Sequence, residues 1–211
     1  AIFRKLIKRF SMKNQAPEII LASASKSRKL LLKNAGLNFR VETSNVDEKQ
    51  LKKDMEGTPV ESLVLRLASA KAEVVYQTNK KSLIIGADQM LECENTLYDK
   101  PTDYSDAFEH LKKLQGKMHR LITGVCIIYH GEVIWTFVDQ VSLEMRSLSD
   151  KFINEYLEIV GPEIFSTVGS YRLEGHGAQL FNHVTGDFFT VLGLPVLPLL
   201  TFLRAKNFMV S

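Results

Sequence analysis

The sequence predicts an α/β fold in which long strands are mixed with helices rather than alternating regularly with them. Two long apolar strands, over residues 117–129 and 132–146, meet at a predicted hairpin turn at His130 and Gly131. Segments with helical spacing of apolar residues precede and follow this hairpin. With 211 residues, the chain can form one large domain or two small lobes that share a cleft.

The first part of the chain is predicted to begin with a strand, a polar turn and a helix. An apolar run ends at Ser23, and leucines at helical spacing follow until Gly36 ends the helix. Pro59 begins a second, longer helix. The predicted elements are a strand over 18–22, a helix over 26–35, a strand over 38–43, a polar loop over 44–58 and a helix over 59–77.

The later elements follow from turn and cap residues. Glu94 and Asn95 indicate a hairpin turn, Gly116 indicates a helix end and Ser149 indicates a helix N-cap. The predicted elements are a strand over 82–91 that Gly86, Ala87 and Asp88 interrupt, a helix over 103–115, the two long strands, a helix over 149–159, an irregular glycine-rich segment over 161–187 and a closing helix over 195–206.

Positive charge is concentrated at the start of the chain. The net charge is +3, and residues 1–11 carry four cations and no acid, so residues 12–211 carry a net charge of −1. A nearly neutral body lacks the broad basic face that a nucleic acid polymer requires. It suits a small anionic ligand bound by a few converging cations.

Residues 1–11 form a basic amphipathic extension to a single predicted domain over residues 12–211. The apolar residues of the extension recur at helical spacing opposite its cations, as in a helix that lies on a membrane surface. Alternatively, because Met12 follows at once, the segment is a dispensable upstream extension of the reading frame. No apolar run reaches the roughly 18 residues that a membrane span needs.

The two cysteines bear on the compartment. Cys93 and Cys126 show neither metal-binding nor redox spacing, and two thiols make no disulfide framework. They are expected to be reduced, which predicts a cytoplasmic location.

The turn between the first strand and the first helix is a candidate phosphate site. It carries Ser23, Ser25 and Arg28, and the first N–H groups of a helix lack partners within it and carry partial positive charge. Hydroxyls and a guanidinium at such a terminus favour phosphate binding. The alternative is that Ser25 or Ser27 merely caps the helix.

Acids and lysines further along the chain complete a set suited to phosphoryl chemistry. Glu48 lies in an acidic segment, Asp88 follows a buried apolar run, Lys71 lies on the long helix and Lys100 precedes a proline. Carboxylates bind a hard divalent cation, and lysine or arginine neutralises phosphate charge. Each acid taken alone is more typical of a solvated charge or a helix cap.

Eight segments between about residue 18 and residue 204 form an ordered series of motifs. The first are Leu21-Ala22-Ser23-Ala24-Ser25-Lys26-Ser27-Arg28, Ser44-Asn45-Val46-Asp47-Glu48 and Arg66-Leu67-Ala68-Ser69-Ala70-Lys71-Ala72. Next come Gly86-Ala87-Asp88-Gln89, Asp99-Lys100-Pro101 and Leu114-Gln115-Gly116-Lys117-Met118-His119 with Thr123-Gly124-Val125. The last are Gly169-Ser170-Tyr171-Arg172-Leu173-Glu174-Gly175 and Leu192-Gly193-Leu194-Pro195. In order and spacing, these eight segments resemble the motifs of the Maf family.

The resemblance implies an elongated mixed β-sheet flanked by helices, with two lobes around a central cleft, and a homodimer. It implies an enzyme that uses Mg²⁺ or Mn²⁺ and cleaves a nucleoside triphosphate to the monophosphate and pyrophosphate, with water attacking the α-phosphorus. By matching position, Asp88 is the catalytic acid and, with Glu48, a metal ligand. The substrate contacts expected from the motifs and the phosphate turn are Ser23, Ser25, Arg28, Lys71 and Lys100.

Departures from the family's motifs fall mainly on the side expected to bind the base. Ser27 stands where the family has a second arginine, and Gln89 stands where it has threonine. Residues 166–169 lack the family's acid and lysine, and Glu174 replaces the usual glutamine. These changes leave open the alternative that the protein is a nucleotide-binding regulator of septum formation with little catalytic activity.

Glu174 bears on the choice of base. An ionised carboxylate accepts hydrogen bonds but donates none, so it fits the two adjacent donors of guanine, and the cationic ring of 7-methylguanine better still. The segment around it resembles that of the Maf branch that acts on 7-methyl-GTP. The alternatives are that Glu174 pairs with Arg172 or Lys26, and that the enzyme prefers dTTP or UTP. His176 is a candidate ligand contact, whereas His110 and His119 are expected to be surface or packing residues.

Overall fold

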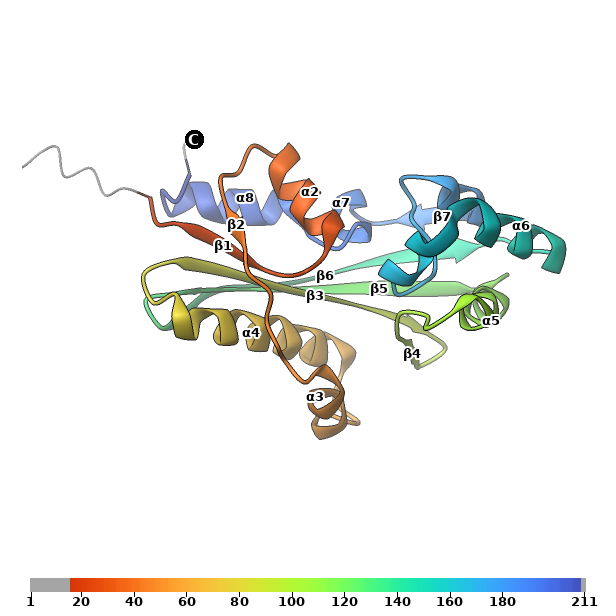
Figure 1. Cartoon of the computed structure of the whole chain (residues 1–211), viewed down its shortest axis with the longest axis horizontal. Coiled ribbons are helices and arrows are strands. Elements are labelled where there is room, and N and C mark those ends of the chain that lie inside the picture. The colour runs from red at the N-terminus through yellow and green to blue at the C-terminus, as the bar shows by residue number, and fades with distance from the viewer. Residues whose placement is uncertain (1–15, 210–211) are drawn as a thin grey trace, which may run out of the picture.

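A seven-stranded mixed sheet with helices on both faces forms the body of the protein (Figure 1). The computed structural model describes residues 16–209. Its strands are β1 (Ile19–Ala22), β2 (Arg40–Val41), β3 (Leu83–Cys93), β4 (Thr96–Tyr98), β5 (Met118–Tyr129), β6 (Glu132–Met145) and β7 (Phe181–Thr185). Their order is β2-β1-β3-β5-β6-β7, with β4 paired to the end of β3. β1 runs parallel to β2 and β3, and the other pairs are antiparallel.

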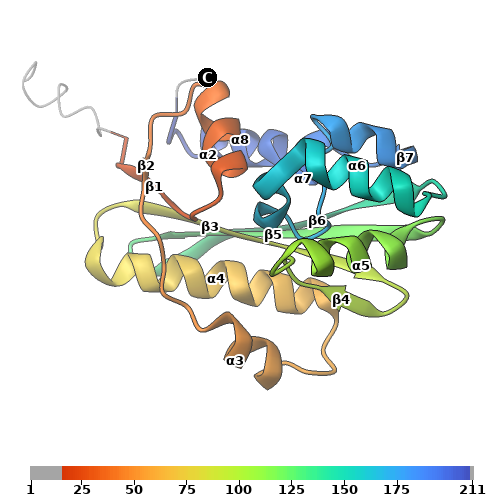
Figure 2. The ribbon, with the colours of Figure 1, turned by 45° about the vertical axis from the view of Figure 1, so that its right-hand side comes forward.

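Helices cover different parts of this elongated sheet. α4 (Val60–Thr78) runs along one face, whereas α2 (Lys26–Asn34) and α8 (Val196–Ala205) lie on the other (Figure 1). α5 (Tyr104–Leu114) and α6 (Asp150–Val160) lie toward the other end of the sheet and share an apolar cluster with it (Figure 2). The shorter helices are α3 (Glu48–Asp54), α7 (Phe188–Val191) and the 3₁₀ helices η1 (Gly161–Ser166) and η2 (His176–Leu180).

Two glycines allow α4 to approach the sheet closely. A Cβ atom at Gly86 would lie 2.1 Å from the carbonyl oxygen of Ala68, and one at Gly124 would lie 3.0 Å from the backbone nitrogen of Leu65. Gly86 precedes Asp88 by two residues, and Gly124 is the partner of Asp88 in the pairing of β3 with β5. On both strands beside Asp88, the helix therefore packs against bare backbone.

The predicted α/β class, with its mixed sheet flanked by helices, is confirmed. So are the β5–β6 hairpin and the N-cap at Ser149, whose hydroxyl accepts a hydrogen bond from the Phe152 backbone at 3.2 Å. Both cysteines are buried free thiols. Within residues 16–209, no helix has the length and apolar character that a membrane span requires.

Two predictions about local structure were wrong. Residues 44–58 are not all loop, because α3 forms there; it buries none of its residues fully, so its sequence carries little apolar periodicity. β3 is not interrupted at Gly86, Ala87 and Asp88, because all three pair with β5. The glycine in this segment serves close packing rather than a turn.

Other predictions were incomplete or stay open. The second strand is limited to Arg40–Val41, and residues 161–187 contain η1, η2 and β7. The extension over residues 1–11 lies outside the described residues, so its surface-binding role stays a prediction. The division of residues 12–211 into two lobes around a cleft also stays a prediction.

Candidate active site

The turn between β1 and α2 is organised by two serine hydroxyls. Ser25 caps α2, because its Oγ accepts a hydrogen bond from the Arg28 backbone N–H at 3.3 Å. Ser23 Oγ accepts from the Ser25 backbone N–H at 3.3 Å and from Arg28 Nη1 at 3.1 Å. The capping alternative is therefore observed for Ser25, and Ser23 is held beside the guanidinium.

Arg28 is buried, at 8% exposed, and joins three segments of the chain. Its Nε donates to the Gly193 carbonyl at 2.7 Å, and its Nη1 donates to the Ala87 carbonyl at 3.0 Å. Burial lowers the pKa of Arg28, while the charges of Asp88 and Glu48 oppose this shift. Since its hydrogen bonds go to neutral oxygens, the guanidinium keeps a positive charge for an anion to neutralise.

Three predicted site residues from three different elements meet in an ion-pair cluster. Lys71 Nζ, from α4, lies 2.5 Å from Asp88 Oδ1 on β3 and 2.8 Å from Glu48 Oε1 at the start of α3. The side chains of Lys71 and Asp88 are 12% and 11% exposed, whereas that of Glu48 is 45% exposed. We refer to Glu48, Lys71 and Asp88 as the Asp88 cluster.

Two further residues support this cluster. Asp47 is a helix cap, because its Oδ1 accepts from the Gln50 backbone N–H at 2.9 Å, and it fixes the start of α3 just before Glu48. Asp99 forms an ion pair with Lys52 of α3, which joins the segment that carries Lys100 to that helix. Desolvation by the surrounding protein lowers the pKa of Lys100, and the positive charges of Arg28 and Lys71 lower it further. The negative charges of Glu48 and Asp88 oppose this shift. Lys100 therefore belongs to the same electrostatic neighbourhood although it reaches solvent.

The cluster fits a divalent cation that a substrate helps to bind. The described residues contain no group of three His, Cys, Asp or Glu side chains that could bind a metal ion by themselves. However, Glu48 and Asp88 each place one oxygen within 3 Å of a common cation, the ammonium of Lys71. Mg²⁺ typically uses one or two carboxylates and takes its other ligands from phosphates and water. This donor set therefore fits Mg²⁺ or Mn²⁺ beside a bound phosphate.

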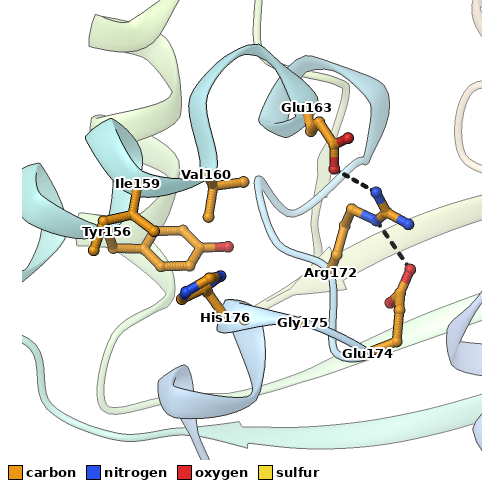
Figure 3. Close-up of a pocket in the computed structure, with 9 residues that line it drawn as sticks. Tyr156, Ile159, Val160, Glu163, Arg172, Glu174, Gly175 and His176 are labelled. Atoms are coloured by element: carbon orange, nitrogen blue, oxygen red, sulfur yellow. Dashed lines mark hydrogen bonds and ion pairs between the residues drawn. The ribbon is translucent and has the colours of Figure 1, made fainter.

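Glu174 lines a pocket of about 380 Å³ between α6 and η2 (Figure 3). Its Oε1 accepts from Arg172 Nε at 2.9 Å, and Glu163 of η1 pairs with Nη1 of the same arginine. The pairing of Glu174 with Arg172 is the alternative foreseen from the sequence. Tyr156 and His176 also line this space, which we call the Glu174 pocket.

Beneath the Glu174 pocket, buried polar contacts position the irregular chain. His119 Nε2 forms a hydrogen bond with Tyr171 Oη at 2.8 Å, and Tyr156 Oη donates to the Ser170 carbonyl at 3.1 Å. Burial lowers the pKa of His119 to about 4, so the ring is neutral at pH 7. The sequence predicted that His119 is either a surface or a packing residue, and the structure shows that it is a packing residue.

Two sets of contacts were not predicted from the sequence. Gln89 Nε2 donates to Thr123 Oγ1 at 2.9 Å and to the Thr190 carbonyl at 2.8 Å, which joins β3 to α7. Glu163 and Tyr156 line the Glu174 pocket. No local motif marks the last two residues, since they come from α6 and η1 and meet Glu174 only through the fold.

The chain resembles known proteins along most of its length. The profile of the Maf family, described as Maf-like protein, matches residues 18–206. A 7-methyl-GTP pyrophosphatase of Rhizobium meliloti is 43% identical over 190 residues, covering 89% of this chain and 96% of that protein. A nucleoside triphosphate pyrophosphatase of Nitrobacter winogradskyi is 41% identical over 188 residues, covering 89% of this chain and 93% of that protein. Among solved structures, the Staphylococcus aureus Ham1 protein is a distant match, with a TM-score of 0.47 and 17% identity over 90% of this chain and 99% of its own.

Proposed function

This chain belongs to the Maf family, and from that premise we propose that it is a nucleoside triphosphate pyrophosphatase, which hydrolyses its substrate to the nucleoside monophosphate and pyrophosphate. The names of both relatives support this activity. The observation in the structure that supports it most is a buried arginine, Arg28, whose hydrogen bonds within residues 16–209 go to neutral oxygens, together with two carboxylates that converge on Lys71.

The cations of the site suit a triphosphate. Arg28, Lys71 and Lys100 supply three positive charges, and Ser23 supplies a hydroxyl at the N-terminal end of α2. A helix N-terminus with such groups around it stabilises phosphate oxygens. As charge moves onto the leaving pyrophosphate, these cations stabilise it more than they stabilise the bound substrate.

Asp88 is the proposed catalytic carboxylate. It lies in the middle of β3, is buried, and forms an ion pair with Lys71 in the free protein. A carboxylate in this position can accept a hydrogen bond from the attacking water and orient it toward the α-phosphorus. A divalent cation bound by Glu48 and Asp88 would offset negative charge on the phosphates.

For the base, we propose a guanine-type substrate, in particular 7-methyl-GTP, with Glu174 as the recognising residue. Glu174 Oε1 is engaged by Arg172, so its other oxygen is the one that a base donor would meet. The carboxylates of Glu163 and Glu174 outnumber the one arginine between them, which favours a cationic ring over a neutral one. A cytoplasmic location remains a prediction from the two cysteines, and a homodimer remains a prediction from the resemblance.

A nucleotide panel tests this function. The purified protein is incubated with 7-methyl-GTP, GTP, dTTP and UTP in Mg²⁺ or Mn²⁺, and released pyrophosphate is measured. We expect release from at least one nucleotide, with the highest kcat/KM for 7-methyl-GTP. Tight binding without pyrophosphate release from any of the four would instead support a nucleotide-binding regulator, and a preference for dTTP or UTP would remove Glu174 as the recognising residue.

A further inference from the structure

Lys71 occupies the space between the two carboxylates that are proposed to bind the divalent cation. Its ammonium nitrogen lies 2.5 Å from Asp88 Oδ1 and 2.8 Å from Glu48 Oε1, the distances of charge-assisted hydrogen bonds. A Mg²⁺ ion bound by the same two oxygens would lie about 2.1 Å from each. The ammonium and the cation therefore compete for one position.

The ion pair between Lys71 and Asp88 is sheltered from water. Their side chains are 12% and 11% exposed, whereas those of the ion pair between Lys112 and Asp150 are 35% and 63% exposed. Solvent and salt screen a sheltered pair much less than a surface pair. Displacing Lys71 is correspondingly harder for a cation that arrives by itself.

The surrounding charge also opposes a free cation. Arg28 and Lys100 both interact electrostatically with Glu48 and Asp88. With Lys71, these cations give the site three positive charges against two negative ones. A triphosphate reverses this balance, and its oxygens offer Lys71 another partner. Because the lysine side chain is long and flexible, its ammonium can turn to the phosphates while α4 stays in place.

We propose that Lys71 excludes the divalent cation from the free protein, and that the cation binds together with the nucleotide. This inference rests on the proposed function, since it takes Glu48 and Asp88 as the metal-side carboxylates. Lys71 then has two successive partners, the carboxylates before the substrate binds and the phosphates afterwards. The substrate itself thereby prepares the metal site.

Binding of Mn²⁺ to the nucleotide-free protein, followed by electron paramagnetic resonance, tests this inference. Lys71→Gln removes the charge and should bind Mn²⁺ roughly tenfold more tightly than the wild type, or more. Lys71→Arg keeps the charge and should bind it as weakly as the wild type. Lys112→Gln, which removes a lysine from a carboxylate pair elsewhere, is the matched control and should leave the affinity unchanged.

A double variant locates the gain. In Lys71→Gln with Asp88→Asn, the tighter binding of Mn²⁺ should be lost. The inference is overturned if folded Lys71→Gln binds Mn²⁺ no better than the wild type, or if the gain persists in the double variant. Melting curves establish that each variant is folded.

The wild type provides a measurement that needs no variant. An α,β-methylene triphosphate, which the enzyme cannot cleave, should raise the amount of bound Mn²⁺ above that held by the nucleotide in solution. An equal amount with and without the protein contradicts the inference. These measurements involve no turnover, so a protein that releases no pyrophosphate while Lys71→Gln still gains Mn²⁺ affinity would contradict the proposed function and not this inference.

Discussion

The Asp88 cluster and the Glu174 pocket both combine acids with a cation, but they differ in how the charges are held. In the cluster, Asp88 and Lys71 come from a central strand and a long helix, and both are largely buried. In the pocket, Glu163 and Glu174 flank Arg172 on short 3₁₀ turns and loops, and Glu163 is 61% exposed. Under the proposed function, the region built on regular elements serves the common reaction and the irregular region serves the choice of base.

The largest difference between the regions should appear in turnover. Asp88→Asn keeps the shape of the side chain but removes its charge, and we expect kcat to fall roughly a thousandfold. Glu92→Gln is the matched control, since Glu92 lies on the same strand and pairs with Arg120. Steady-state kinetics of both variants measure kcat, and melting curves establish that both are folded. Full activity of Asp88→Asn would remove Asp88 from the mechanism.

The next effect should appear in stability. Arg28→Lys loses buried hydrogen bonds to Gly193 and Ala87, and we expect the free energy of unfolding to fall by about 2–3 kcal/mol. Arg172→Lys, at a partly exposed ion pair in the Glu174 pocket, should cost less than about 1 kcal/mol. Urea denaturation measures both values. Equal losses would show that the two regions do not differ in rigidity.

Acid should lower the stability of the fold through His119, which contacts Tyr171 near the Glu174 pocket. Burial lowers its pKa to about 4, whereas an unfolded histidine has a pKa of about 6.5. Between these values the unfolded chain binds a proton that the folded protein does not, so this contribution destabilises the fold as the pH falls from 6.5 to 4. At pH 5 it amounts to about 2 kcal/mol. Urea denaturation at pH 7 and pH 5 should show a smaller loss for His119→Gln than for the wild type; equal losses would contradict the assignment.

The smallest effect concerns the base. Glu174→Gln should reduce the preference for 7-methyl-GTP over dTTP and UTP by about tenfold in kcat/KM, because it replaces a charge-assisted hydrogen bond by a neutral one. Turnover of dTTP and UTP should be little changed, and the free energy of unfolding should change by less than about 1 kcal/mol. Kinetics with the four nucleotides provide the measurement. An unchanged ranking would mean that Glu174 does not contact the base.

The sequence predicted the regions with regular structure best. The β5–β6 hairpin has a marked turn and long apolar runs, and α4 has a clear apolar face, so both were placed within one or two residues. α3 was missed because none of its residues is buried, so its sequence has no clear apolar face. It is positioned instead by its cap and by the ion pair of Glu48. β7 was missed because it is a short edge strand that pairs with one neighbour.

The candidate site divides in the same way. Convergence of Glu48, Lys71 and Asp88 could be expected from their motifs, although the pairing of Lys71 with both acids could not. The turn at Ser23 and Arg28 was foreseeable as a strand-to-helix junction. The contribution of Glu163 was not, because it reaches Arg172 from a 3₁₀ helix whose course depends on tertiary packing.

The two glycines beside Asp88 determine how narrow the gap between α4 and the sheet can be. A methyl group at position 86 would overlap the Ala68 carbonyl, so α4 would have to lift away from the sheet. Lys71 is one turn further along the same helix and would be carried away from Asp88 with it. Under the proposed mechanism the reaction rate therefore depends on this interlayer gap, which is narrow because positions 86 and 124 carry no side chain. A survey of tolerated substitutions should therefore find position 86 as intolerant as the charged residues, although a glycine has no side chain to contribute to the reaction.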